Sequence, residues 1–240
     1  MTTIISRYAG KWDAQFRALV GDEIFPNVVS RALFAGFYRS GKSTLPRKLW
    51  ACENVTMHKS MPVDDMIGGY VLREGSTQWA DGPLVRAMRC GKPVVLDEID
   101  QGSPDTRCLL HAALDDPPAV TLPSGERVTA TQGYAVIATT NADPCSLPQG
   151  IYDRFDLIVR VDTLSEGLRT QLGNMADAAE AVAGRGIDWI NGWQRPPSVN
   201  LFLAAAKLRR HGMPDEDIGH ALGLVGLAYT DFLAVIANRT

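Results

Sequence analysis

The chain has 240 residues, of which 45% are hydrophobic and 21% are charged, and its formal net charge is −3. This composition excludes a mainly disordered chain, and the slightly acidic balance does not indicate a nucleic-acid coat protein, although a local basic loop remains open. No apolar run reaches the roughly 20 residues of a membrane span. The N-terminal residues lack the pattern of a signal peptide and no two cysteines have CxxC spacing, so we expect reduced thiols and a cytoplasmic location.

Short apolar runs alternate with helical stretches along the first two thirds of the chain. The runs are residues 31–36, 93–96, 134–138 and 157–161, and the helical stretches include 44–52, 83–89 and 104–114. Each run is too short for a helix and nearly continuous in hydrophobicity, which is typical of parallel strands covered on both faces. The alternation predicts an α/β fold with a parallel sheet flanked by helices.

The pattern changes after about residue 163. Strand signals vanish, and helical periods are predicted at 166–183, 198–211 and 215–236. We therefore expect an α/β core in residues 1–163 and a small all-helical C-terminal domain in residues 164–240.

The segment from Gly36 to Ser43 fits the pattern GxxxxGK[ST] and lies between a predicted strand and a predicted helix. Glycines let such a loop curl so that its backbone N–H groups point at phosphate oxygens, and the following helix adds its positive end. Lys42 supplies charge to the β- and γ-phosphates, and the Ser43 hydroxyl binds Mg²⁺. A glycine-rich turn that matches by chance is the alternative. The predicted phosphate-binding residues are Gly36, Arg39, Ser40, Gly41, Lys42, Ser43 and Thr44.

Polar side chains follow the second and third of these runs. Asp97 ends the second run and is placed to hold Mg²⁺ beside the loop, while Glu98 is placed to act as the general base toward water. Asn141 follows the third run and can orient that water without adding charge. The alternatives are two solvated carboxylates and a turn-forming asparagine.

Arg154 precedes the fourth run. An arginine at this place can reach a neighbouring subunit's nucleotide as an arginine finger. The alternative is an ion pair with an aspartate on the surface of its own chain, which is worth little.

These four elements, in this order and followed by a helical tail, resemble an AAA+ ATPase. Segments 64–70, 82–89 and 96–100 are similar to the MoxR-like branch, which includes the small cobalt-chelatase subunit and the dynein- and midasin-related proteins. The resemblance covers roughly residues 30–215. It implies a P-loop NTPase core in residues 1–163 with a helical lid in residues 164–240, and it is the sole ground for ATP rather than GTP. It also implies a homo-oligomeric ring, which we expect to be a hexamer.

Two segments resemble the β-hairpin inserts that this branch places toward its central pore or its substrate. Residues 69–79 alternate around a Glu-Gly turn, and residues 120–128 form two short strands around Ser-Gly. Ordinary surface hairpins are the alternative for both.

One position departs from the family pattern. The branch usually carries an arginine, called sensor 2, shortly after a serine at a helix start, whereas Asn200 follows Ser198 here. Arg195, one turn earlier, is a substitute for which no spacing argument exists. The departure predicts slow hydrolysis or a different response of the lid to nucleotide.

The combined prediction is a Mg²⁺-dependent ATPase that remodels a partner protein or complex. The alternative is a nucleotide-controlled, ring-forming binding module or a nucleic-acid-associated motor subunit. Asn200 favours the alternative, and the Asp97-Glu98 pair favours the first interpretation. A small-molecule P-loop kinase is a third interpretation, disfavoured because it does not need Asn141, Arg154 or the helical tail.

Overall fold

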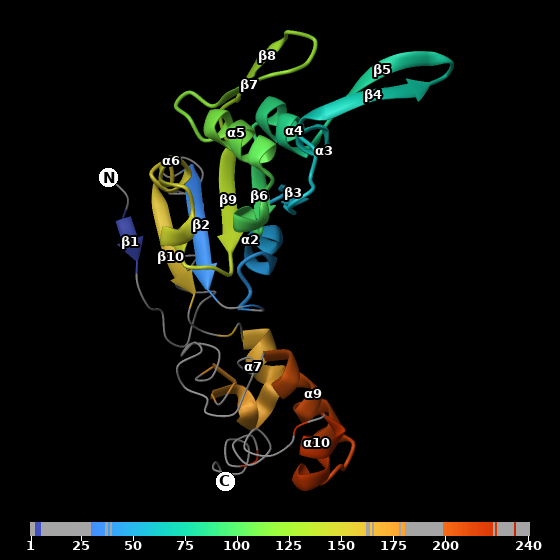
Figure 1. The fold of residues 1–240 in the computed structure, drawn as a ribbon, viewed down its shortest axis with the longest axis vertical. Coiled ribbons are helices and arrows are strands. Elements are labelled where there is room, and N and C mark those ends of the chain that lie inside the picture. The colour runs from blue at the N-terminus through green and yellow to red at the C-terminus, as the bar shows by residue number, and fades with distance from the viewer. Residues whose placement is uncertain are drawn as a thin grey trace. The chain divides into compact units, whose positions relative to one another are not determined.

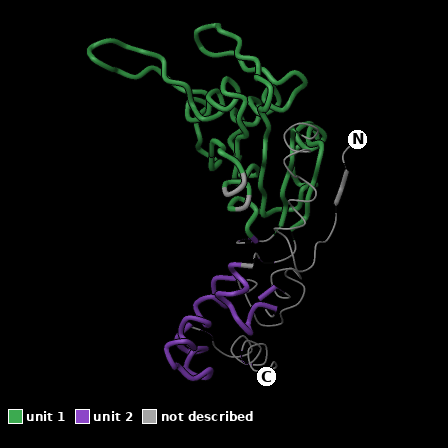
Figure 2. The backbone as a smooth tube through the Cα atoms, turned by 180° about the vertical axis from the view of Figure 1, so that it is seen from behind, with its two compact units in different colours: residues 1–7, 14–36, 41–161 green, residues 8–13, 37–40, 162–240 purple. Residues whose placement is uncertain are grey.

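The computed structural model describes most of the chain between Ser30 and Leu222. The described residues are 3–5, 30–36, 38, 40–161, 164, 166–177, 179–180, 199–222, 224 and 233. They fall into two compact units, which Figure 2 colours separately. Residues 3–5, 30–36 and 41–161 belong to the first unit, and the other described residues belong to the second. Arg39, Arg195 and Ser198 lie outside the described residues.

The first unit is built on a six-stranded sheet in which every neighbouring pair of strands is parallel. Its central strands are buried on both faces, which confirms the parallel α/β fold expected from the apolar runs. Glu53–Thr56 was not expected as a strand, because only Val55 of its four residues is buried at this sheet edge. In spatial order the strands are β1 (Thr3–Ile5), β10 (Leu157–Val161), β2 (Arg31–Gly36), β9 (Ala135–Thr140), β6 (Pro93–Asp97) and β3 (Glu53–Thr56).

Short helices connect these strands. Helix α4 begins with a proline at its first position and ends before Gly91, whose φ of 59° is the left-handed conformation that favours glycine. The Ser103 hydroxyl caps α5 by accepting a hydrogen bond of 3.2 Å from the Thr106 N–H. The helices are α2 (Thr44–Leu49), α3 (Asp64–Ile67), α4 (Pro83–Cys90), α5 (Pro104–Ala113) and α6 (Gln149–Tyr152), with 3₁₀ turns η1 (Ile99–Gln101) and η2 (Pro144–Ser146).

Two antiparallel hairpins project from the end of the sheet at which the strands begin, away from the arrowheads of β2 and β9 (Figure 1). One consists of β4 (Gly68–Arg73) and β5 (Ser76–Asp81), and the other of β7 (Ala119–Thr121) and β8 (Arg127–Thr129). Both occur where the sequence predicts hairpins. The turn of the first is made by Glu74 and Gly75, both at positive φ, as a tight hairpin turn requires.

The second unit is helical in its described part and has a hydrophobic core of its own, which includes Leu172, Phe202 and Ile218. Its elements are α7 (Glu166–Leu172), the 3₁₀ turn η3 (Gly173–Met175), α9 (Val199–Arg210) and α10 (Asp215–Ala221). The first predicted helix is interrupted at Gly173, whose φ is 57°. Across both units, none of the helices in the described ranges has the length and apolarity that crossing a membrane requires.

Candidate nucleotide-binding site

The loop after β2 begins where two strands approach closely. A Cβ atom on Gly36 would lie 2.1 Å from the carbonyl oxygen of Val161 on β10, so only glycine fits there. Gly41 has a φ of 95°, and its carbonyl oxygen accepts a hydrogen bond of 3.1 Å from Thr44, the first residue of α2. Ser40 and Lys42 are buried. The strand, loop and helix therefore follow one another as the GxxxxGK[ST] pattern predicts.

Lys42 connects this loop to the end of β9. Its ammonium donates to the carbonyl oxygen of Gly36 at 2.9 Å and to Oδ1 of Asn141 at 3.0 Å. Burial lowers the pKa of Lys42 to about 8, while nearby carboxylates, that of Asp97 foremost, act in the opposite direction. The structure thus brings together two residues that are 99 positions apart in the sequence.

Asp97 ends β6 and is buried beside β9. Its Oδ1 accepts a hydrogen bond of 2.9 Å from the Thr139 hydroxyl, and its Oδ2 pairs with the guanidinium of Arg47 on α2. β6 and β9 are parallel neighbours, and Leu96 is level with Ala138. Asp97 and Thr139, the next residues, therefore lie side by side at the carboxyl end of the sheet. The carboxylate is therefore held in place by both a strand and a helix.

Glu98 has an unusual backbone conformation for its residue type. Its φ of 56° and ψ of 49° are left-handed, and its N–H donates to the Thr139 hydroxyl at 3.3 Å. No hydrogen bond or ion pair to its carboxylate is found within the described ranges, and the residue is half-exposed. Such a strained position beside a buried carboxylate is a common feature of functional sites.

The end of β9 is fixed by a second hydroxyl. Thr140 donates to Oδ1 of Asp100 at 2.7 Å and accepts from the Ala142 N–H at 3.0 Å, across the turn that presents Asn141. Two adjacent threonines therefore attach the strand that carries Asn141 to the segment that carries Asp97 and Glu98.

These residues form one polar cluster at the carboxyl ends of three neighbouring strands. The donor set fits a magnesium nucleotide, because carboxylate and hydroxyl oxygens, here those of Asp97 and Ser43, are the ligands that Mg²⁺ prefers. When bound, the ion would neutralise charge on the phosphate oxygens. Lys42 would add a positive charge at the same place.

Arg154 lies at the other end of the sheet. It precedes β10, whose Leu157 is level with Ala32 at the start of β2, whereas Val161 is level with Gly36 at the loop. The four steps from Leu157 to Val161 span about 13 Å at roughly 3.3 Å per residue. Arg154 is therefore separated from the P-loop of its own chain by the length of the strand.

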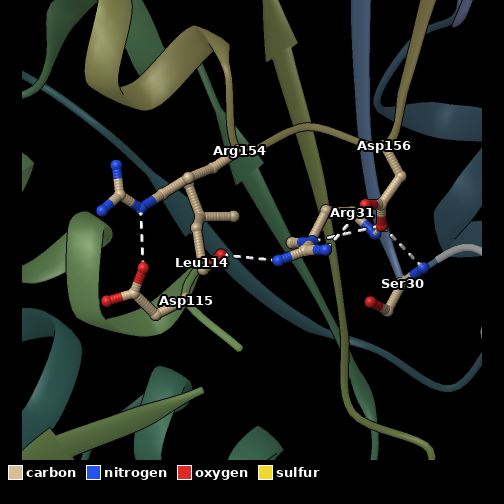
Figure 3. Close-up of polar contacts among 6 residues, drawn as sticks. All are labelled: Ser30, Arg31, Leu114, Asp115, Arg154 and Asp156. Carbon is tan, nitrogen blue, oxygen red and sulfur yellow. Dashed lines mark hydrogen bonds and ion pairs between the residues drawn. The ribbon is translucent and has the colours of Figure 1, made fainter. Parts of the chain in front are cut away.

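The side chain of Arg154 is engaged within its own chain (Figure 3). Its Nε donates to Oδ1 of Asp115 at 2.9 Å, and its Nη1 donates to the carbonyl oxygen of Gly150. This is the intramolecular pair that the sequence leaves open as an alternative to the arginine finger. The Arg154 side chain nevertheless remains 30% exposed.

Several residues of the cluster were not predicted. Arg47 and Thr139 contact Asp97, and Thr140 bonds to Asp100 and Ala142 around Asn141. The sequence shows neither that β6 lies beside β9 nor that α2 faces Asp97. The only available signal is the pair of hydroxyl residues at the end of a buried strand. Asn200 is an exposed residue of α9 in the second unit.

Residues 41–155 match the AAA domain of the dynein-related subfamily. This match runs from Gly41 in the loop after β2 to Phe155 before β10, within the first unit. The resemblance to the MoxR-like, dynein-related branch of the AAA+ ATPases is thereby confirmed. The assignment agrees with the loop after β2 and the carboxylates after β6.

Two curated relatives and one solved structure are similar to the chain. Protein NorQ of Paracoccus denitrificans is 36% identical over 178 residues, 66% of this chain and 64% of NorQ. The denitrification regulatory protein NirQ of Pseudomonas aeruginosa is 29% identical over 183 residues, 68% of each chain. The crystal structure of NtrX from Brucella abortus in complex with ADP has a TM-score of 0.53 and 19% identity, covering 97% of this chain and 56% of that one. The match thus spans less than two thirds of NorQ, and the NtrX likeness concerns the fold alone.

Proposed function

We propose that this chain binds ATP with Mg²⁺ at the P-loop and hydrolyses it in order to remodel a partner protein or complex. The observation that carries the proposal is the convergence of Lys42, Asn141, Asp97 and Glu98 at the carboxyl ends of three neighbouring strands. ATP, rather than GTP, is proposed on the family. Residues 164–240 are proposed to act as its lid.

Each residue of the cluster has a separate part in the proposed reaction. Lys42 binds the phosphates by its charge, and Ser43 and Asp97 hold the metal ion. The carboxylate of Glu98 takes the proton from the attacking water, and the amide of Asn141 orients that water. The hydroxyl of Thr139 supports this arrangement because it bonds both to the Asp97 carboxylate and to the Glu98 N–H.

Arg154 is proposed to complete the site of a neighbouring subunit. Its place at the start of β10, about 13 Å of strand away from the loop, supports action on another chain rather than its own. Such action requires an oligomer, and the family suggests a ring, which we propose to be a hexamer. Turnover per subunit should then rise with protein concentration. Constant turnover across a wide dilution series would contradict the proposed role of Arg154.

The hairpin of β4 and β5 is the proposed contact for the partner. Tyr70 and Leu72 are 61% and 77% exposed at its surface, and Tyr70 packs edge-to-face against Trp79 with ring centroids 5.2 Å apart. Exposed apolar side chains on a projecting hairpin favour contact with another protein. This agrees with the placement of such hairpins in the MoxR-like branch.

The Glu98→Gln variant provides a direct test of the proposed function. It should keep nucleotide binding and lose turnover, so that ATP holds the partner on the protein for capture from the native source. Lys42→Ala, which should lose nucleotide binding, is the matched control. Unchanged turnover in Glu98→Gln would remove Glu98 from the role of base.

A nucleotide-controlled binding module is a second candidate, favoured by two observations. Asp97 is already paired with Arg47, which competes with a metal ion, and Asn200 stands where the family usually has arginine. Measured turnover that stays near zero with candidate partners or DNA, combined with nucleotide-dependent binding to one of them, would favour this candidate.

A further inference from the structure

Arg154 belongs to a closed set of contacts rather than to an isolated surface pair (Figure 3). Its partner Asp115 directly follows Leu114, and the Leu114 carbonyl oxygen accepts a hydrogen bond of 2.9 Å from Nη1 of Arg31. The Arg31 guanidinium in turn binds both carboxylate oxygens of Asp156, at 3.1 and 2.7 Å. Asp156 is two residues after Arg154, so this series of contacts links Asp115 back to the segment that carries Arg154.

The Arg31–Asp156 half of this set is well anchored. The two side chains are only 21% and 29% exposed, and the backbone N–H groups of Ser30 and Arg31 also donate to Asp156, at 3.3 and 3.1 Å. The hydrogen bond with Asp156 raises the pKa of Arg31 above its usual value. Phe155, between Arg154 and Asp156, is buried. The backbone that carries Arg154 is therefore fixed at the start of β10.

Packing limits the Arg154 side chain on its other side. A Cβ atom on Gly150 would lie 2.9 Å from Cε1 of His111 and 3.6 Å from Nη1 of Arg154. Within the described part of the chain, Nε and Nη1 of Arg154 have partners and no hydrogen bond reaches Nη2. The guanidinium is thus held through Nε and Nη1, and Nη2 makes no hydrogen bond with the described residues.

We infer that Asp115 and Arg31 are positioning residues that hold Arg154 ready to act on a neighbouring subunit's nucleotide, an inference that rests on the proposed function. A long, flexible arginine side chain loses rotamer freedom when it docks, and contacts made in advance within its own chain reduce that loss. Asp115 binds the guanidinium directly, and Arg31 bonds to the carbonyl oxygen of Leu114, the residue between α5 and Asp115.

Turnover of single and double variants tests this inference. Replacing Arg154 by alanine should lower kcat by roughly 10³-fold, as loss of an arginine finger does. Asp115→Ala should lower kcat roughly 2- to 10-fold with KM unchanged, because ordering one such side chain is worth about that much. The double variant should be no slower than Arg154→Ala alone. Glu53→Ala, which removes the 2.8 Å surface pair with Arg86, is the matched control and should keep kcat.

Mixed oligomers show on which side of the interface Asp115 acts. Subunits with Lys42→Ala should fail to bind nucleotide but still supply an intact Arg154. Added in excess, they should restore turnover to Asp115→Ala subunits, because the defect lies in the supplied arginine and not in the nucleotide site of the same chain. Failure of this rescue, while the same mixture restores Arg154→Ala, would overturn the inference.

A readout independent of turnover is the Nε–H signal of Arg154 in protein labelled with ¹⁵N-arginine. Hydrogen exchange at this group should be slow in the native chain and fast in Asp115→Ala, and intermediate in Arg31→Lys. Equal exchange in all three would overturn the inference. If Arg154→Ala lowers turnover but Asp115→Ala does not, only the inference fails. If Arg154→Ala keeps full turnover, the proposed role of Arg154 fails as well.

Discussion

The left-handed backbone of Glu98 predicts that this residue is placed for its reaction at the expense of stability. At φ 56° an alanine is strained by about 1–2 kcal/mol, whereas glycine is not. Glycine in turn loses about 0.5–1 kcal/mol through its greater freedom in the unfolded chain. Glu98→Ala and Glu98→Gly both remove the carboxylate, so they differ only in these two effects. The glycine variant should be more stable by about 0.5–1 kcal/mol.

Urea unfolding followed by circular dichroism measures this difference. With a slope near 2 kcal/mol/M, the midpoint of Glu98→Gly should lie about 0.25–0.5 M above that of Glu98→Ala. Both variants should lose turnover. Glu74 is a matched control, because it has a φ of 50° in the exposed turn of the first hairpin. Replacing it by glycine rather than alanine should give a similar gain, with turnover retained.

One combination of results would contradict the left-handed backbone of Glu98. If glycine stabilises the chain relative to alanine at Glu74 but not at Glu98, then the Glu98 backbone is not held in the left-handed conformation. Retained turnover in either Glu98 variant would separately show that another group takes the proton.

Three further predictions concern other parts of the first unit. Gly36→Ala should destabilise the chain by more than about 2 kcal/mol and abolish binding of a fluorescent nucleotide, because its Cβ meets the Val161 carbonyl oxygen; wild-type affinity would contradict this. Arg47→Met should lower the Mg²⁺ concentration that gives half-maximal turnover about 3-fold or more, because Asp97 loses a competing cation, and a higher requirement would count against competition. Leu72→Ser should leave basal turnover unchanged and weaken capture of the partner about 10-fold, since a buried leucine contributes about 1.5–3 kcal/mol, and undiminished capture would exclude the hairpin as the contact.

The parts of the fold that depend on local patterns were predictable from the sequence. The strand that includes Val94 and Val95 is continuous in apolar residues because both of its faces are covered, and the loop from Gly36 to Ser43 carries its own signature. The edge strand Glu53–Thr56 has one buried residue, so its pattern is that of a loop.

The supporting contacts of the site depend instead on which elements become neighbours. The bond from Thr139 to Asp97 exists because β6 and β9 are adjacent, and the pair of Asp115 with Arg154 exists because the end of α5 lies beside α6. No local spacing encodes either neighbourhood. The candidate residues could therefore be selected from the sequence, whereas the residues that hold them required coordinates.

The placement of Lys42 and Arg154 at opposite ends of one parallel sheet has a consequence for assembly. A donor and an acceptor that face opposite ways cannot both meet the same partner, so the proposed contact is head-to-tail rather than two-fold symmetric. In an open row of such subunits, the site at one end lacks an arginine from a neighbour. Only a closed ring gives every nucleotide site its arginine. The place of the lost site in a closed ring with a single defective subunit would then depend on the variant: Lys42→Ala would silence that subunit's own site, and Arg154→Ala the site of one neighbour.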